Sequence, residues 1–167
     1  MLQFSQLIHK YGADNFMTNI SFNDECVHVV FLGLPNVPGI AAEIFSTLSA
    51  NSVSVSMVTQ NAMRGGRSDM SFLISRDRLD DVIALCRELS EKVGGQGVSF
   101  MTEIAAITVS FASPEDAPGT LAEVFSALAS AKVNIEIINS TQDSAICIVN
   151  RTKAQDGLDA LKMAFNG

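Results

Sequence analysis

The chain contains one segment twice, and this repeat limits what it can fold into. Residues Pro38–Val58 (PGIAAEIFSTLSANSVSVSMV) align without a gap with Pro118–Ile138 (PGTLAEVFSALASAKVNIEII), at an offset of 80 residues. Eight of the 21 positions are identical, including the Pro-Gly start and an internal Glu and Phe. Unrelated amphipathic helices share scattered apolar residues, but not this combination in phase. Because solenoid repeats have periods of only about 20–50 residues, the sequence predicts two copies of one small domain.

Composition indicates a folded chain and excludes several classes of function. The 167 residues are 47% hydrophobic and 17% charged, which is ample apolar material for a core. The 18 Asp and Glu against 11 Lys and Arg give a net charge of −7, so no nucleic-acid partner is expected, because a phosphate backbone requires clustered cations. No apolar run approaches the roughly 18 residues of a membrane span, and the start MLQFSQLIHK does not resemble a secretory signal. We therefore expect a cytoplasmic location and no membrane partner.

The residue patterns of the first copy predict the order β-α-β-β-α. The β-rich run Val27–Gly33 precedes the turn Asn36–Gly39, in which Pro38 suits the first turn of a helix. Two alternating strands separated by the loop Asn61–Ser68 follow, and then a second helix that is expected to start near Asp77 and Asp80. The predicted inward positions are Ile40, Ala41, Ile44, Phe45 and Leu48 on the first helix, Val53, Val55, Met57, Met70, Phe72 and Ile74 on the strands, and Leu79, Val82, Ile83, Cys86 and Leu89 on the second helix.

The second copy predicts the same order of elements. Two short runs outside this pattern, Asn19–Phe22 and Val98–Phe100, are candidates for one further strand in each copy. The expected fold class is therefore α+β, with two ferredoxin-like β-α-β-β-α-β lobes in tandem, each an antiparallel sheet with its helices on one face. The uncovered face of each sheet is expected to pack against another lobe or another chain.

Residues typical of catalysis or metal binding are scarce. The two histidines, His9 and His28, have no Cys, Ser or carboxylate partner at motif spacing, and His28 lies in an apolar run where a packed strand residue is the simpler interpretation. The sequence has no phosphate-binding glycine signature, no GxSxG and no HExxH. We expect no catalytic residue, no metal site and no cofactor in this chain, and three buried cysteines outside any disulfide: Cys26, Cys86 and Cys147.

A β-α-β-β-α-β lobe with Pro-Gly at its first strand–helix turn resembles the ACT domain, a small-molecule sensor of amino-acid metabolism. Two such lobes in tandem narrow the resemblance to the regulatory region of aspartate kinases. The first copy is similar to that family's first ACT domain, including Gln60-Asn61 and the acidic-x-Ser-Phe strand Asp69–Phe72. The second is similar to its second ACT domain, including the Val-Asn-Ile-Glu of Val133–Glu136.

The resemblance implies a domain division. Residues 1–16 are a leader or junction segment, residues 17–95 the first ACT lobe, and residues 96–167 the second. The segment MTNISFNDECVHVVFLG resembles the family's first strand, which in that family completes the second lobe, so residues 18–23 are expected to do the same here.

The resemblance also implies a function. Nothing in the sequence resembles the family's kinase domain or its Lys-x-Gly-Gly motif, so the chain resembles a regulatory β-subunit or an excised C-terminal region. It implies feedback control of aspartate phosphorylation in lysine, threonine and methionine biosynthesis, with lysine or threonine as effector. The implied partners are a kinase catalytic domain or α-subunit and a second copy of the chain, joined through the ACT sheets.

Two other interpretations stay open. One is a free-standing tandem-ACT sensor that regulates a different partner, such as a transcriptional regulator. Against it stands the combination of Gln60-Asn61 with Asp69–Phe72, which favours the kinase. The other is a small enzyme on a ferredoxin-like scaffold, which the absence of a nucleophile–base set in the sequence disfavours.

The Pro-Gly turns are the candidate binding sites. A helix that begins there exposes unpaired N–H groups and the positive end of its dipole, a suitable seat for an α-carboxylate. By resemblance to the family, the effector-binding residues of the first copy are Asn36, Pro38, Gly39, Ile40, Ala41, Ser54, Val55, Ser56 and Gln60. Those of the second copy are Asp116, Pro118, Gly119, Thr120, Asn134, Ile135 and Glu136.

The two candidate sites differ in charge. Asn36, Ser54 and Ser56 are neutral, although the family usually has an Asp at the first of these positions and Asp or Asn at the other two, so the first site suits a neutral, hydroxyl-bearing ligand such as threonine. The second site retains Asp116 and Glu136, which would hold the two ammonium groups of lysine.

Overall fold

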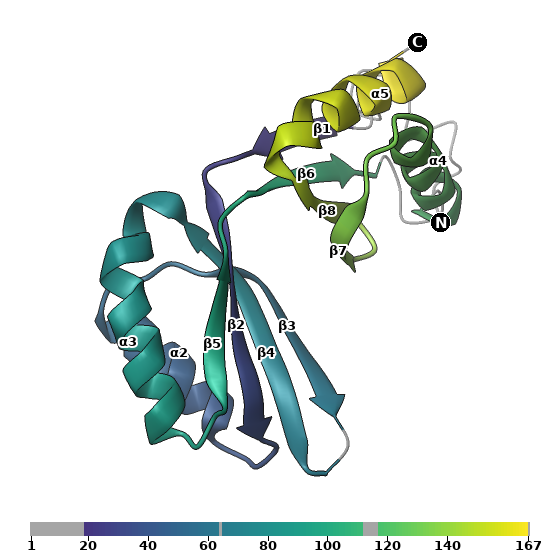
Figure 1. The fold of residues 1–167 in the computed structure, drawn as a ribbon. Helices are drawn as coiled ribbons and strands as arrows, with labels where there is room; N and C mark the ends of the chain where they lie inside the picture. The colour runs from purple at the N-terminus through teal and green to yellow at the C-terminus, as the bar shows by residue number, and fades with distance from the viewer. Residues whose placement is uncertain (1–18, 64, 112–116, 167) are drawn as a thin grey trace, which may run out of the picture. The chain divides into compact units, whose positions relative to one another are not determined.

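The computed structural model describes residues 19–63, 65–111 and 117–166 (Figure 1). The chain forms two compact units. The unit called here the first lobe is Glu25–Ile104, and the second lobe joins the described part of Met1–Asp24 to that of Ala105–Gly167. Each lobe therefore contains one copy of the repeated segment.

The first lobe has the expected ferredoxin-like topology. Its four strands form an antiparallel sheet in the order β3-β4-β2-β5, and both α-helices cover one face of that sheet (Figure 1). The elements in chain order are β2 (Cys26–Pro35), α2 (Ile40–Ala50), β3 (Ser56–Met63), β4 (Arg67–Ser75), the short 3-10 turn η2 (Arg76–Arg78), α3 (Leu79–Lys92) and β5 (Gly97–Met101).

Alternate residues of the central strands fill the core of the first lobe. Phe72 of β4 is fully buried, and its ring centroid lies 6.0 Å from that of Phe31 and 5.7 Å from that of Phe45. The predicted helix stripes face these strands, which confirms the period-3.6 and period-2 patterns of the sequence, except that Ala41, predicted to point inward, is exposed at the start of α2. The buried members are Val27, Val29, Phe31, Leu34, Ile44, Leu48, Val53, Met70, Phe72, Ile74, Val82, Cys86 and Leu89.

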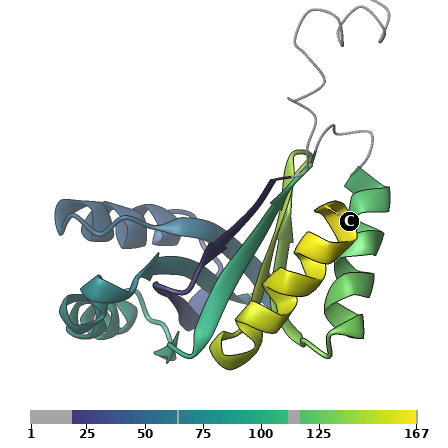
Figure 2. The same ribbon diagram turned by 90° about the horizontal axis from the view of Figure 1, so that it is seen from above.

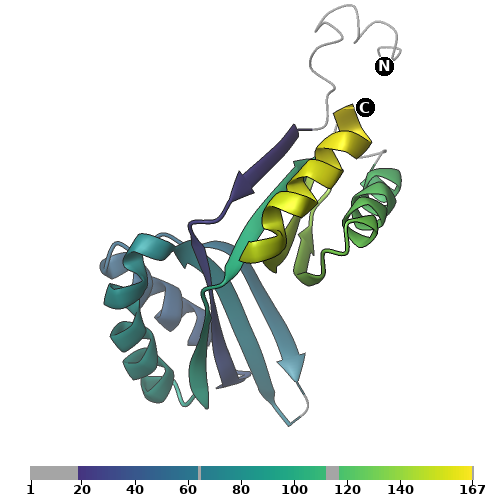
Figure 3. The same cartoon turned by 45° about the horizontal axis from the view of Figure 1, so that its top comes forward.

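The second lobe repeats this topology with a strand from the beginning of the chain. Its antiparallel sheet has the order β1-β6-β8-β7, and β1 pairs with β6 from Asn19↔Ser110 to Asn23↔Ala106 (Figure 3). Helices α4 and α5 lie side by side on one face (Figure 2). The elements are β1 (Asn19–Asn23), β6 (Ile104–Ser110), α4 (Ala117–Ser130), β7 (Ile135–Ser140), β8 (Ser144–Asn150), the 3-10 turn η4 (Arg151–Lys153) and α5 (Ala154–Asn166).

The boundary between the lobes lies later than the sequence-based division at residue 95. Strand β5 pairs with β2 from His28↔Met101 to Leu32↔Gly97, so it completes the first sheet. The first lobe therefore extends to Ile104. A strand as short as β5 can be assigned to a lobe only from its pairing with a strand that is distant in sequence, here β2.

Two expected features of the first lobe are wrong in detail. Strand β3 begins at Ser56 instead of Val53, and its ladder to β4 shifts register between Ser56 and Thr59, where Met57 has a φ of 50°. This is a β-bulge, which inserts one residue into β3 between the Ser56 and Thr59 pairs. The expected loop Asn61–Ser68 is also much shorter, because Gly65 and Gly66, with φ of 82° and 72°, turn the chain sharply.

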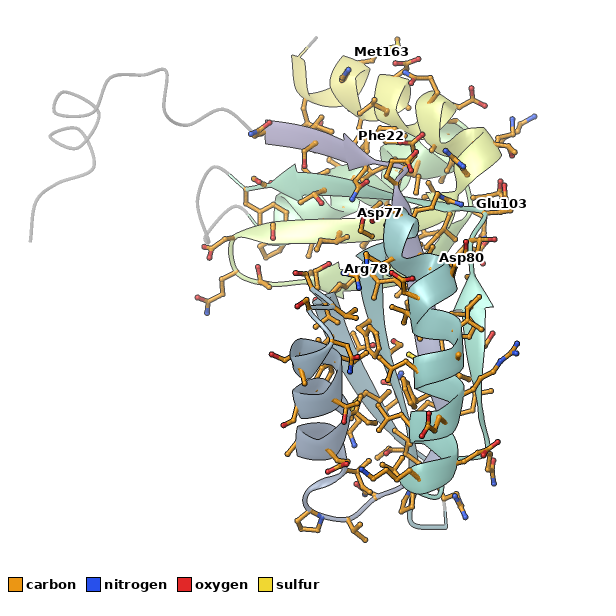
Figure 4. All side chains as sticks on the ribbon, turned by 90° about the vertical axis from the view of Figure 1, so that its left-hand side faces the viewer. Phe22, Asp77, Arg78, Asp80, Glu103 and Met163 are labelled. Atoms are coloured by element: carbon orange, nitrogen blue, oxygen red, sulfur yellow. The ribbon has the colours of Figure 1, made fainter. Side chains whose placement is uncertain are left out.

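Helix α3 starts where expected, but not through an acidic cap. Neither Ser75, which precedes η2, nor Arg78, which precedes α3, makes a side-chain capping hydrogen bond. Arg78 instead donates from Nη1 to the Ser52 carbonyl oxygen at 2.9 Å, which fixes the start of α3 to the end of α2. Figure 4 shows Asp77, Arg78 and Asp80 together at this end of α3.

The cysteines and the helices agree with the sequence analysis. All three cysteines are buried and none forms a disulfide. Burial raises the pKa of Cys86 to about 12 and that of Cys147 to about 11, so both remain neutral thiols at ordinary pH. No helix in the described part of the chain is long and apolar enough to cross a membrane.

Candidate functional site

The Pro-Gly turn of the first lobe leads from β2 into α2 and is open to solvent. Gly39 is the N-cap residue of α2, with a φ of 100° and a ψ of −22°, and among the described residues no side chain caps this end. The first helical bond runs from the Glu43 N–H to the Gly39 carbonyl oxygen at 2.9 Å. A Cβ at Gly39 would meet no described atom within 4 Å. The first-turn N–H groups of α2 are therefore accessible to a ligand anion.

The loop before this turn is fixed to a neighbouring hairpin. The Asn36 N–H donates to the Gly66 carbonyl oxygen, 2.9 Å away in the turn between β3 and β4. The side chains of Asn36 and Pro38 are exposed, and Val37 is 56% exposed. The loop thus has a defined backbone position and side chains that are available for contact.

The predicted strand residues of the first copy lie at the other end of the sheet. Ser56 pairs with Leu73, which in turn pairs with His28 near the beginning of β2. The Pro-Gly turn follows the opposite end of β2, where Pro35 pairs with Arg67. Ser54 and Ser56 are exposed, but one lobe does not bring them to its own Pro-Gly turn.

Gln60 is the predicted strand residue nearest the Pro-Gly end of the sheet. Its Nε2 donates to the Oγ of the buried Ser68 at 3.1 Å, and the neighbouring hydroxyls of Thr59 and Ser71 lie 2.7 Å apart. The side chain of Gln60 is therefore held in place along β3, with its remaining polar groups exposed.

In the second lobe too, the Pro-Gly turn and the predicted strand residues lie at opposite ends of the sheet. The Phe111 N–H donates to the Asp143 carbonyl oxygen at 2.7 Å, so the end of β6 lies beside the β7–β8 turn. Pro118 and Gly119 are exposed in the first turn of α4. Asp116 lies outside the described residues.

The predicted strand residues Asn134 and Glu136 of the second copy lie at the far end of its sheet. Ile135 pairs with Val149 there, and it is flanked by the exposed Asn134 and Glu136. Asn134 donates from Nδ2 to Glu136 Oε1 at 3.2 Å. The amide thus orients the carboxylate, which remains accessible to a cation.

Sequence reasoning overlooked three residues beside the first Pro-Gly turn. Gly33 in β2 has its N–H bonded to Asp69 Oδ1 at 2.7 Å and its carbonyl oxygen bonded to Arg67 Nη1. The resemblance to the family points to the Asp69–Phe72 strand but gives Asp69 no structural role. A glycine near the end of a strand was the available signal, because it often marks a bulge.

The remaining places to look for chemistry are the buried histidine of β2 and clusters of metal-ligating side chains. His28 is 5% exposed, burial lowers its pKa, and neither ring nitrogen has a hydrogen-bond partner among the described residues. It is a packed, neutral strand residue, as the sequence analysis expects. Among the described residues, no three His, Cys, Asp or Glu side chains are arranged to hold a metal ion.

Comparison with known families agrees with this geometry. Residues 27–89 match one family model described as an ACT domain, and residues 100–163 match a second with the same description. The two matches together cover more than half of the chain, one for each copy of the repeated segment. The chain belongs to the ACT domain family.

Relatives of this tandem ACT chain include aspartokinases. It is 27% identical to the aspartokinase of Mycolicibacterium smegmatis over 154 residues, which cover 91% of this chain and 37% of that protein. It is 25% identical to the aspartokinase of a Bacillus species over 146 residues, covering 87% of this chain and 36% of that protein. The tandem ACT chain thus spans little more than a third of the length of these curated relatives.

Solved structures include a protein of the same extent. The ligand-free regulatory subunit of aspartate kinase from Thermus thermophilus is 25% identical, with a TM-score of 0.79, and the match covers 89% of this chain and 98% of that one. E. coli aspartokinase III in complex with lysine and aspartate, in its T-state, has a TM-score of 0.64 at 18% identity, covering 90% of this chain and 33% of that one. The tandem ACT chain matches the regulatory region of aspartokinases.

Proposed function

We propose that this chain binds an amino acid and thereby gives feedback control over aspartate phosphorylation by a kinase catalytic domain or α-subunit. The observation that carries the proposal is the match over nearly the whole of both chains to a separate regulatory subunit of aspartate kinase. A structure of aspartokinase alpha and beta subunits shares the fold, with a TM-score of 0.79. The cytoplasm, where amino acids are made, is the location that this function implies.

The uncapped start of α2 supports the binding of an α-carboxylate. Its free N–H groups and the positive end of the helix dipole favour an anion, and the lack of a side chain at Gly39 allows close approach. A complete site also needs acceptors for the α-ammonium group and groups that select the side chain. We assign these roles to Ser54, Ser56 and Gln60 in the first copy and to Asn134 and Glu136 in the second.

The distance between the Pro-Gly turn and the predicted strand residues of each lobe limits how a complete binding site can be assembled. Because Ser54 and Ser56 lie at the opposite end of the sheet from the Pro-Gly turn of the same lobe, one lobe cannot contribute both halves. A complete site would therefore combine the Pro-Gly turn of one lobe with the strand of another. Pairing of two copies through their ACT sheets provides such a partner lobe, so we propose a homodimer.

The two sites are proposed to take different amino acids. The hydroxyls of Ser54 and Ser56 suit a neutral ligand such as threonine. The Glu136 carboxylate, held by Asn134, and the Asp116 carboxylate suit the two ammonium groups of lysine. In the structure of E. coli aspartokinase III named above, lysine and aspartate are bound to that protein.

Regulation would follow from preferential binding to one arrangement of the lobes. An effector shifts a conformational equilibrium only by the difference in its affinity for the two states. A coupling free energy of about 1–3 kcal/mol gives roughly 5–150-fold control of a partner. Such coupling needs no catalytic residue in this chain.

The test is to add the full chain to the matching kinase catalytic domain and measure aspartate phosphorylation with and without 10 Kd of each amino acid, about 90% saturation on simple mass action. The proposal predicts no turnover by the chain alone and inhibition of the pair by lysine, threonine or both. Binding of an amino acid without any effect on the kinase would contradict control of this kinase and favour the regulation of a different partner. Aspartate phosphorylation by the chain alone would contradict the proposal.

A further inference from the structure

A β-bulge interrupts β2 just before the Pro-Gly turn of the first lobe. The ladder between β2 and β4 pairs Phe31 with Met70 and then Leu34 with Ser68, so β2 contains one residue more than β4 over this span. Gly33 lies in the bulge with a φ of 55°. A bulge bends its strand, so its geometry determines the direction in which β2 continues towards the turn.

Two charged side chains of β4 bind the backbone of this bulge. Asp69 Oδ1 accepts the Gly33 N–H at 2.7 Å, and Arg67 Nη1 donates to the Gly33 carbonyl oxygen. Gly33 is buried, so water cannot readily replace either partner. Hydrogen bonds to charged groups are stronger than neutral ones, and a buried backbone group that loses its partner is costly. The bulge therefore depends on both side chains.

The same arginine connects the bulge to the turn between α3 and β5. Arg67 Nη1 also donates to the Gly94 carbonyl oxygen at 3.0 Å, and the Gln96 N–H donates to the Leu32 carbonyl oxygen at 2.8 Å. On the other side of the bulge, the Asn36 N–H bonds to Gly66, the residue before Arg67. The strand end that enters the Pro-Gly turn is thus held by two separate turns of the lobe.

We propose that Asp69 and Arg67 are positioning residues of the first effector site, which act through the Gly33 bulge on the Asn36–Gly39 loop. The inference rests on the proposed amino-acid binding and adds residues that contact no ligand. The two side chains fix the direction in which the free N–H groups of α2 point. When the offset of 80 residues is extended ahead of the repeated segment, Ser113 takes the position of Gly33, so the second copy has no glycine there.

The test compares Asp69→Ala with Asp69→Asn in the full chain. Alanine removes the acceptor of the Gly33 N–H, whereas the asparagine carbonyl retains it. Titration with threonine and with lysine at 25 °C is expected to give a Kd at the first site about tenfold higher in Asp69→Ala and within about threefold of wild type in Asp69→Asn. The affinity of the second site, identified as the one that Glu136→Ala weakens, is expected to stay unchanged.

Asp80→Ala is the matched control, because Asp80 is exposed at the start of α3 (Figure 4). A purely structural role of Asp69 would lower the melting temperature of Asp69→Ala and leave the Kd of the folded protein unchanged. That result would overturn the positioning role alone. Wild-type protein that binds neither amino acid would overturn the proposed function itself.

Arg67→Lys provides a second variant in case Asp69→Ala does not fold. Both bonds to Gly33 and Gly94 come from Nη1, and the lysine side chain ends one atom short of that position, so its ammonium cannot reach the two carbonyl oxygens as the guanidinium does. The Kd at the first site is expected to rise by about threefold to tenfold, with the second site unaffected. A first-site Kd equal to that of wild type would contradict the inference.

Discussion

The Asn36 N–H donates to the Gly66 carbonyl oxygen at 2.9 Å, and this bond places the Pro-Gly turn of the first lobe beside its β3–β4 hairpin. The predicted strand residue Ser56 pairs with Leu73 at the far end of the same sheet. A binding site that uses both the turn and the strand therefore requires two lobes. This requirement, together with the uncapped start of α2, underlies the predictions below.

Alanine is expected to have opposite effects at the two equivalent glycines. Gly39 has a φ of 100°, so Gly39→Ala should lower the free energy of unfolding by about 1–2 kcal/mol through backbone strain, since a Cβ there meets no described atom within 4 Å. Gly119 lies in α4 without a positive φ, so Gly119→Ala should raise it by about 0.5–1 kcal/mol. Urea unfolding of both variants measures the difference, and equal changes in both would contradict the assigned backbone geometry.

Each lobe has its own core, so core truncations are expected to act locally. Phe72→Ala in the first lobe should cost about 3–5 kcal/mol and Leu128→Ala in the second about 2–5 kcal/mol, because both side chains are fully buried. Amide hydrogen exchange should show protection lost mainly in the lobe that carries the substitution. Equal loss of protection in both lobes for both variants would show that the lobes unfold as one unit.

Stability is expected to depend on pH through His28. Burial lowers the pKa of His28 below the ordinary value of 6.5, so the unfolded chain binds the proton more tightly than the folded one. The free energy of unfolding should therefore fall as the pH drops through about 6.5 and stop falling below the folded-state pKa. Denaturant unfolding between pH 8 and pH 5 would show this (the range spans about 1.5 units either side of the unfolded value).

His28→Leu is the control for this dependence. Leucine has a similar volume, cannot bind a proton and leaves no buried ring nitrogen without a partner, so the variant should be at least as stable as wild type at pH 8, about 1.5 units above the unfolded-state pKa. The carboxylates contribute equally to both proteins, and the difference between the two pH profiles isolates His28. Identical profiles would show that His28 titrates alike in the folded and unfolded chain.

A two-lobe site implies that two copies associate. We expect the isolated chain to elute from gel filtration as a dimer at high concentration, and an amino acid that binds between copies should strengthen the dimer by mass action. A strict monomer at high concentration, with and without lysine or threonine, would contradict the shared site.

Sequence patterns predicted most of the fold because local and periodic features determine it. The repeat fixed the equivalence of the lobes, and the alternation of residues such as Met70, Phe72 and Ile74 identified buried faces. The predicted start of β3 was wrong because Val53 and Val55 pack in the core without joining the ladder, whose first pair is Ser56 with Leu73. Burial can be inferred from the alternation of apolar and polar residues along a strand, whereas strand pairing also depends on the partner strand.

The candidate site was less predictable than the fold. The open Pro-Gly turn follows directly from a proline and a glycine at a helix start, which are local features. The separation of Ser56 from that turn, and the contacts of Asp69 and Arg67 with Gly33, depend on strand order and register. Neither feature is visible in a linear sequence. Asp69 and Arg67, for example, are each more than 30 positions from Gly33 along the chain.

The most direct test of the central claim is a calorimetric titration of the full chain with lysine and with threonine, in wild type, Glu136→Ala and Ser56→Ala. We predict saturable binding of at least one amino acid, with lysine binding weakened by Glu136→Ala and threonine binding weakened by Ser56→Ala. Unchanged lysine binding in Glu136→Ala would contradict the assignment of the second site. The absence of any binding by wild type would contradict the proposal that this tandem ACT chain is an amino-acid sensor.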